Sequence, residues 1–280
     1  MNDSLVKALF QTEAIEVCNE KDPFWYASGH IGPYYVNTHY LLGSKKAAET
    51  LLDTINQLLE GDRINCINTL MECYKSAYNS NNIYRLTIDS LVDSAKKLID
   101  ANKCDLISGG ERRDWYFSVM TAQILNIPHV YIFKNGDMFL YHKEEISSIE
   151  SLNNAKVLHM ADIITQASSY LTQWIPAITK AGGKIVTSLT VVDRLQGGAE
   201  NLSKHDIASH SLVNIDRSLF SQAKDNNVIT YEQYEILNNY IENPYESMRE
   251  FLIKNPDFIQ KSIKMGGKTE QRAKMNIYNL

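Results

Sequence analysis

The stretch VLHMADIITQASSYL, residues 157–171, holds a carboxylate and a run of small and hydroxyl-bearing residues in an order that suits phosphate chemistry. Its apolar start reads as a buried strand, and Asp162 follows at the strand end. The turn after it offers backbone N–H groups, a helix dipole and three hydroxyls to an anion. Asp162 is placed to accept from sugar hydroxyls or to reach a hydrated Mg²⁺ ion. On this stretch alone, an ordinary strand, loop and helix with an N-capping hydroxyl is the alternative. The residues of the turn are Thr165, Gln166, Ala167, Ser168 and Ser169.

A second candidate anion site lies in LISGGERRDWYFS, residues 106–118. It begins inside CDLI, residues 104–107, which reads as a short buried strand. Glycines let a ligand approach the backbone closely, and two guanidinium groups can neutralise a diphosphate. A helix-start loop with two solvated arginines is the alternative. The candidate residues are Ser108, Gly109, Gly110, Arg112 and Arg113.

An arginine and two tyrosines in other segments have the chemistry to bind a flat, acidic ring. Arg194 in VVDRLQGG follows an expected strand, and a guanidinium fork suits a carboxylate bidentately. Tyr34 and Tyr35 in PFWYASGHIGPYYVN can stack on a flat pyrimidine. The alternatives are a surface ion pair for Arg194 and core packing for the tyrosines.

Strands and helices alternate through the middle of the chain and place these segments at strand ends. An Asn-Gly pair at 135–136 marks a tight hairpin turn. This alternation predicts βαβ units and a mostly parallel α/β sheet, in which ligands bind beyond the carboxyl ends of the strands. Strands are expected at 104–107, 129–133, 156–160 and 184–192, and helices at 115–125 and near 167–181.

Helical patterns flank this α/β region. Apolar residues recur at helical spacing between 44 and 101, and the chain reads helical again from about 203. A short amphipathic helix is expected at 5–17, and the basic tail after Met265 is expected to be loosely ordered. We therefore divide the chain into an N-terminal segment, a helical block, an α/β core and a C-terminal helical extension. Their bounds are 1–43, 44–103, 104–202 and 203–280.

The composition excludes several classes of protein. The 280 residues are 44% hydrophobic and 22% charged, as in ordinary globular proteins. A net charge of −5 argues against a general nucleic-acid binder. We expect no signal peptide and no membrane-spanning segment, because no window approaches 18 uncharged apolar residues. Four scattered cysteines without a CxxC pair fit reduced thiols in a cytoplasmic protein.

Taken together, over roughly 10–43 and 104–200, these segments resemble the type I phosphoribosyltransferases, and orotate phosphoribosyltransferase most closely. VLHMADIITQASS resembles the family's motif for the ribose 5-phosphate of phosphoribosyl pyrophosphate. FWYASGHIGPYYVN resembles the N-terminal pattern that lines the base pocket, and VVDRLQGG resembles the strand-end motif whose arginine contacts the pyrimidine carboxylate. The resemblance implies a flavodoxin-like sheet of this family's kind, to which the helical block at 44–103 and the C-terminal extension are additions.

The family's properties then give each candidate an expected role. The resemblance implies a pentosyl transferase of pyrimidine biosynthesis that uses Mg²⁺, acts in the cytoplasm as a homodimer and binds neither nucleic acid nor membrane. Asp162 and Lys134 are the expected catalytic residues, with Asp162 at the ribose hydroxyls or Mg²⁺ and Lys134 near the pyrophosphate. The turn from Thr165 to Ser169 is expected at the 5-phosphate. Ser108 to Gly110 with Arg112 and Arg113 are expected at the pyrophosphate, and Tyr34, Tyr35 and Arg194 at the base.

Several positions depart from the family's pattern and keep other functions open. Ala161 stands at the first of two usual acids, Ala27 replaces a lysine, and a short hairpin after Lys134 replaces the mobile catalytic loop. A non-catalytic protein that binds phosphoribosyl pyrophosphate or a nucleotide is therefore the alternative to an enzyme. A third option is an α/β protein whose extra helices form a partner interface.

Overall fold

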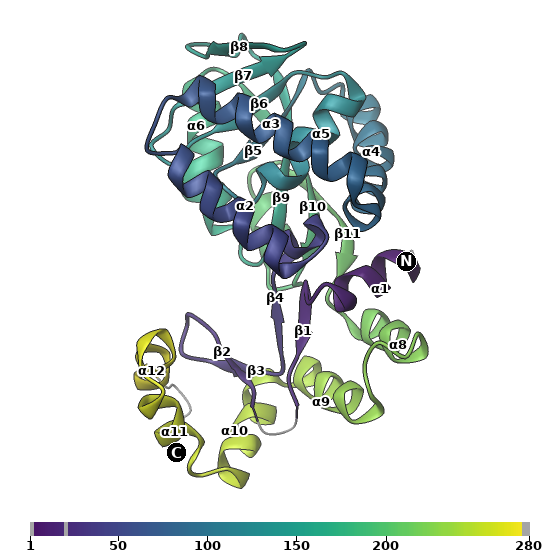
Figure 1. Cartoon of the computed structure of the whole chain (residues 1–280), viewed down its shortest axis with the longest axis vertical. Helices are drawn as coiled ribbons and strands as arrows, with labels where there is room; N and C mark the ends of the chain where they lie inside the picture. The colour runs from purple at the N-terminus through teal and green to yellow at the C-terminus, as the bar shows by residue number, and fades with distance from the viewer. Residues whose placement is uncertain (1–2, 20–21, 276–280) are drawn as a thin grey trace. The chain divides into compact units, whose positions relative to one another are not determined.

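The structure, a computed structural model, describes residues 3–19 and 22–275 (Figure 1). Residues 38–215 form one compact unit, and the described residues before and after them form a second. The helices that follow Gly43 belong to the same unit as the sheet, and most of the N-terminal segment belongs with the C-terminal helices. The division into four segments stays a prediction.

A seven-stranded sheet in the order β11-β10-β9-β5-β6-β7-β8 is the centre of the first unit. The strands from β11 to β6 are parallel, whereas β7 and β8 run antiparallel as hairpins at one edge. The predicted α/β fold with a mostly parallel sheet is confirmed. The strands are β5 (Leu106–Gly110), β6 (His129–Ile132), β7 (Met138–His142), β8 (Glu145–Ser148), β9 (Lys156–Ile164), β10 (Lys184–Asp193) and β11 (Ala208–Asn214).

Strands β5, β9 and β10 bring the candidate segments to one edge of the sheet. Nearly every residue of β9 and β10 is buried, as expected for parallel strands covered on both faces. Because parallel strands end at the same edge, Gly110, Asp162 and Asp193 lie near one another there. The sequence predicted strands β5, β6, β9 and β10 within a few residues but missed β8 and β11.

The long helices after Gly43 begin at side-chain caps. Ser44 accepts a hydrogen bond from the Ala47 N–H at the start of α2, and Asp62 accepts one from Asn65 at the start of α3. The helical block predicted at 44–101 is therefore present as three helices. The helical elements are η1 (Thr38–Leu42), α2 (Lys45–Leu58), α3 (Arg63–Ser80), α4 (Asn82–Asn102), α5 (Trp115–Leu125), η2 (Tyr170–Trp174), α6 (Ile175–Lys180) and α7 (Gly198–Ser203).

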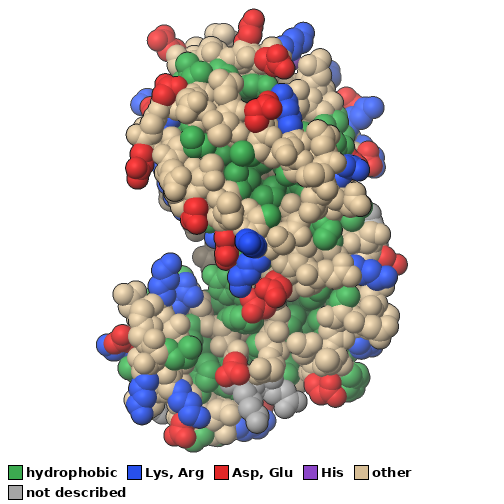
Figure 2. Space-filling model, in the orientation of Figure 1, with side chains coloured by type: hydrophobic (Ala, Val, Ile, Leu, Met, Phe, Trp, Pro, Cys, Tyr) green, Lys and Arg blue, Asp and Glu red, His purple; other side chains and the backbone are tan. Residues whose placement is uncertain are grey.

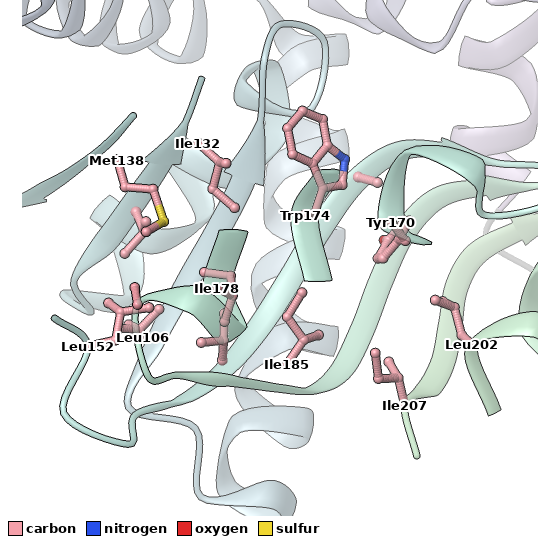
Figure 3. Packing of buried hydrophobic residues seen from close by; sticks show 14 of the residues in the cluster. Leu106, Ile132, Met138, Leu152, Tyr170, Trp174, Ile178, Ile185, Leu202 and Ile207 are labelled. Carbon is pink, nitrogen blue, oxygen red and sulfur yellow. The ribbon is translucent and has the colours of Figure 1, made fainter. Parts of the chain in front are cut away.

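A hydrophobic cluster lies between the sheet and the helical turns of η2 and α6. Figure 3 shows Trp174 and Ile178 turned toward residues of the sheet such as Ile132 and Ile185. Ala161 belongs to the same cluster and is 4% exposed. The cluster therefore holds the start of the helix that follows the predicted phosphate turn.

The second unit combines short strands with helices and corrects two predictions. The helix expected at 5–17 ends at Gln11, because Ile15–Val17 pairs as a strand with Tyr34–Val36. The tail after Met265 is helical up to Lys274, and residues 276–280 lie outside the described part. The elements are α1 (Asp3–Gln11), β1 (Ile15–Val17), β2 (Phe24–Trp25), β3 (Ile31–Gly32), β4 (Tyr34–Val36), α8 (Arg217–Asp225), α9 (Tyr231–Glu242), α10 (Pro244–Lys254), α11 (Phe258–Lys264) and α12 (Gly267–Lys274).

The surface carries charges of both signs. Figure 2 shows Lys and Arg side chains interspersed with Asp and Glu on the face drawn. Among the described residues, none of the helices has the length and apolar character needed to cross a membrane.

Candidate functional site

A cavity of about 460 Å³ opens at the carboxyl ends of β5 and β9. Most of the residues predicted at the phosphate, pyrophosphate and ribose line this one cavity. The aromatic side chains of Tyr170 and Trp174 and the side chain of Asp114 line it as well. The predicted residues that line it are Arg112, Arg113, Lys134, Asp162, Thr165, Ala167, Ser168 and Ser169.

The turn after β9 has the backbone geometry of an anion loop. Ala167 lies in the left-handed region with φ 60°, which residues other than glycine seldom adopt. The backbone is helical from Ser168, so the turn leads straight into a helix start. Free N–H groups at such a start favour a phosphate. Gln166 does not line the cavity, but its carbonyl oxygen accepts a hydrogen bond from Asn201 Nδ2 at 3.1 Å.

Asp162 is buried at the wall of the cavity and is 7% exposed. Its Oδ2 accepts a hydrogen bond from Thr38 Oγ1 at 2.8 Å. Burial raises the pKa of this carboxyl, while the positive charge of Arg113 and the bond from Thr38 lower it in part. Thr38 was not among the predicted site residues, although a hydroxyl directly after the aromatic segment was visible in the sequence.

Asp114 is a second buried carboxylate that the sequence reading left without a role. Its Oδ1 accepts the N–H of Asp162 and its Oδ2 accepts the N–H of Gly110, both at 3.0 Å. Burial and the neighbouring charge of Asp162 raise the pKa of Asp114 well above its ordinary value. The sequence feature that could have indicated Asp114 is its acidic side chain directly after two arginines in SGGERRDW.

Ser108, Gly109 and Gly110 form the strand that leads into the arginine loop, and none of the three lines the cavity. A Cβ on Gly109 would lie 2.2 Å from Ser118 Oγ, and one on Gly110 would lie 2.2 Å from Trp174 Cζ2. The close approach that these glycines permit is therefore to the protein's own side chains. Ser108 is fully buried, and its Oγ lies 2.8 Å from His159 Nδ1.

Three cationic side chains reach the cavity from two loops. Arg112 donates a hydrogen bond to Asn56 Oδ1 on α2, and its peptide bond with Glu111 is cis. Burial raises the pKa of Asp162 and lowers that of His39 to about 3; the charge of Arg113 opposes the first shift and adds to the second, so Arg113 acts on both groups. The Lys134 N–H donates to Glu111 Oε2 at 3.1 Å, which joins the hairpin loop to the arginine loop.

His159 lies beneath this site and is neutral. Its Nε2 is 3.8 Å from Asp114 Oδ2, but burial lowers the pKa of His159 to about 3. The contact is therefore not an ion pair at neutral pH. The ring of His159 packs edge-on against Tyr170, with ring centroids 4.7 Å apart.

The residues predicted at the base do not line this cavity. The Arg194 N–H donates to the Ile164 carbonyl oxygen at 3.0 Å, which ties the loop after β10 to the end of β9. Tyr34 and Tyr35 lie in the second unit. Tyr34 is 3% exposed and packs against Phe220 and Tyr240, which is the core-packing alternative for this residue. Tyr35 is half-buried beside Phe24 and Tyr26.

The donor set at the cavity fits a magnesium ion that arrives with a phosphorylated ligand. Mg²⁺ is usually held by one or two carboxylates together with substrate phosphates. Asp162 and Asp114 line the cavity beside the predicted phosphate turn. Within the described ranges, no group of three or more His, Cys, Asp or Glu residues could hold a metal by itself.

Comparisons with known proteins agree with this fold. The chain is 29% identical over 165 residues to orotate phosphoribosyltransferase of Sulfolobus acidocaldarius, over 58% of this chain and 78% of that protein. The chain is a divergent relative of the type I phosphoribosyltransferases. The fold of this phosphoribosyltransferase-like chain matches the orotate phosphoribosyltransferase of Francisella tularensis with a TM-score of 0.53 at 14% identity, over 85% of this chain and 96% of that one.

A larger protein shares the same fold. The structure of Leishmania donovani UMP synthase matches with a TM-score of 0.57 at 19% identity, over 84% of this chain. The phosphoribosyltransferase-like chain spans only 41% of the length of that protein. No family model matches the sequence.

Proposed function

We propose that this chain is a phosphoribosyltransferase that joins a nucleobase, with orotate as the first candidate, to the ribose 5-phosphate of phosphoribosyl pyrophosphate. Pyrophosphate is released. The observation that carries the proposal is the convergence of an anion turn, a buried carboxylate and three cationic side chains on one cavity of about 460 Å³. A ligand with a phosphate at one end and a diphosphate at the other fits this distribution of charge.

Each set of residues binds a different group of the ligand. The turn from Thr165 to Ser169 takes the 5-phosphate, and Asp162 accepts from the ribose hydroxyls. Arg112, Arg113 and Lys134 neutralise the pyrophosphate as its bond to the anomeric carbon breaks. The ribose then carries positive charge until a ring nitrogen of the base forms the new bond. Mg²⁺, held by Asp162, would supply further charge stabilisation to the departing pyrophosphate.

The proposal also covers the residues that bind the base and the oligomeric state of the protein. Arg194 is assigned to an acidic group of the base, because a guanidinium binds carboxylate bidentately. Tyr35, and Tyr34 if its ring leaves its packing, are assigned to the flat face of the base. A homodimer is the assembly that we propose.

A protein that binds phosphoribosyl pyrophosphate or a nucleotide without turnover is the second candidate. Two features favour it: Ala161 at the position of one usual acid, and the tight turn between β6 and β7 where a mobile catalytic loop is expected. The cavity would then serve recognition alone.

Pyrophosphate release from phosphoribosyl pyrophosphate and Mg²⁺ with a panel of nucleobases tests the proposal. We expect turnover with orotate, and a loss of roughly a hundredfold or more for Asp162→Asn and Arg194→Ala, because each removes a charged contact to the ligand. Calorimetric binding of phosphoribosyl pyrophosphate without turnover on any base would establish the second candidate. Absence of both binding and turnover would remove both.

A further inference from the structure

We propose that Asp114 is a ligand-binding residue of this cavity and supplies, from the loop after β5, the second carboxylate that position 161 lacks. The acidic pair for the ribose hydroxyls is then Asp114 with Asp162, split between two strand ends. This inference rests on the proposed function, because it assumes that the ligand carries a ribose.

The position of Asp114 is fixed by the backbone. Its two carboxylate oxygens accept the N–H groups of Asp162 and Gly110, each at 3.0 Å. The first of these bonds anchors the carboxylate at the peptide group that joins Ala161 to Asp162. Asp114 therefore lies beside the place where an acid at position 161 would begin, although the two residues are 47 positions apart in the sequence.

The Asp114 and Asp162 side chains hydrogen-bond to each other, and both residues line the cavity. A carboxylate offers about four lone-pair sites. Asp114 uses one on each oxygen for a backbone N–H, and Asp162 accepts from Thr38 on Oδ2. Asp162 and Asp114 are 7% and 8% exposed. Sugar hydroxyls can donate to the acceptor sites that these bonds leave open.

The surroundings of Ala161 explain why the second acid comes from elsewhere. Ala161 packs in the hydrophobic cluster with Ile164, Tyr170 and Trp174. A carboxylate at this position would be buried against apolar groups, which is costly for a charge. Asp114, in contrast, reaches the same edge of the cavity with its oxygens hydrogen-bonded.

Two ligands that differ by the ribose test the inference. Calorimetry with MgCl₂ would compare phosphoribosyl pyrophosphate with inorganic pyrophosphate on wild type and Asp114→Asn. We expect the variant to lose roughly ten- to a hundredfold affinity for phosphoribosyl pyrophosphate, as for loss of a charged hydrogen bond. Its affinity for pyrophosphate should stay within about twofold, because the arginine loop does not lose its cations. Equal loss for both ligands, or no loss for either, would overturn the inference in favour of a purely structural role.

Controls separate this inference from the proposed function and from misfolding. Ser118→Ala is the matched control, because it removes a buried hydrogen bond to His129 Nε2 at 2.9 Å on a residue that does not line the cavity. It should bind both ligands as wild type does. If Asp114→Asn does not fold, Asp114→Ser replaces it in the experiment. The serine hydroxyl can still accept one backbone N–H. Wild type that binds no phosphoribosyl pyrophosphate would refute the proposed function itself.

Discussion

At the scale of single residues, Arg112 and Arg113 are neighbours with different surroundings. Arg112 donates to Asn56, whereas the charge of Arg113 acts on Asp162 inside the site. We therefore expect Arg113→Ala to weaken binding of inorganic pyrophosphate with MgCl₂ by roughly ten- to a hundredfold, measured by calorimetry. Arg112→Ala should cost less, because its guanidinium is already shared with the Asn56 amide.

Arg217 is the control for loss of an arginine as such. It pairs with Glu242 on the surface of the second unit, and its side chain is 55% exposed. Arg217→Ala should leave pyrophosphate binding unchanged. A larger loss for Arg112→Ala than for Arg113→Ala would contradict the assignment of Arg113 as the main cation of the site.

At the scale of elements, the loop after β10 packs against the predicted phosphate turn after β9. A Cβ on Gly198 would lie 2.6 Å from Ile164 Cγ1 and 2.7 Å from the Thr165 carbonyl oxygen. Gly198→Ala must therefore displace the start of the turn or the start of α7. We expect a loss of about 1–3 kcal/mol in the free energy of unfolding, as for other overpacked sites, together with weaker phosphate binding. Urea denaturation and calorimetry with inorganic phosphate measure the two effects.

Gly61 gives the matched glycine control. A Cβ there would meet only the Leu58 carbonyl oxygen, at an ordinary 3.7 Å. Gly61→Ala should change neither the free energy of unfolding by more than about 0.5 kcal/mol nor phosphate binding. Were Gly198→Ala as harmless as Gly61→Ala, the two loops would not depend on each other.

At the scale of the whole molecule, three buried histidines make stability depend on pH. Burial lowers the pKa of His39, His129 and His159 to about 3. Because the unfolded chain protonates these groups near pH 6.5, their contribution is present above that pH and is lost as the pH falls toward 3. The raised pKa values of Asp114 and Asp162 act in the opposite direction, since their contribution is lost as the pH rises.

A histidine variant isolates one part of this dependence. Between pH 6 and pH 4, each buried histidine adds about 1.4 kcal/mol per pH unit to the decline in the free energy of unfolding. His129→Gln should therefore reduce the slope by about that amount, measured by urea denaturation at a series of pH values. His205→Gln, on an exposed residue, should keep the wild-type slope. Equal slopes for His129→Gln and wild type would mean that His129 is not neutral in the folded protein.

Local pattern predicted most of the first unit, since hydrophobic periodicity reports directly which face of an element is buried. Strands β5, β9 and β10 and helix α5 follow from it, as do the loops that carry Arg113 and the turn from Thr165. The sequence pattern gave the wrong prediction where strand pairing determined the structure. Ile15–Val17 continues a helical pattern but pairs with Tyr34–Val36, and β11 is a half-exposed edge strand with many polar residues.

The candidate site likewise contains residues that local sequence predicts and residues that only the tertiary structure brings together. The sequence by itself indicated that Asp162, the turn from Thr165 to Ser169 and the loops with Arg113 and Lys134 follow strand ends, because each is a local arrangement at one strand end. Thr38 and Asp114 contact Asp162 from 124 and 48 residues away in the chain, and no local spacing encodes such contacts. Asp114 lines the cavity because the order of the strands brings the ends of β5 and β9 to one edge of the sheet. Thr38 hydrogen-bonds to Asp162 from the start of η1, outside the lining of the cavity.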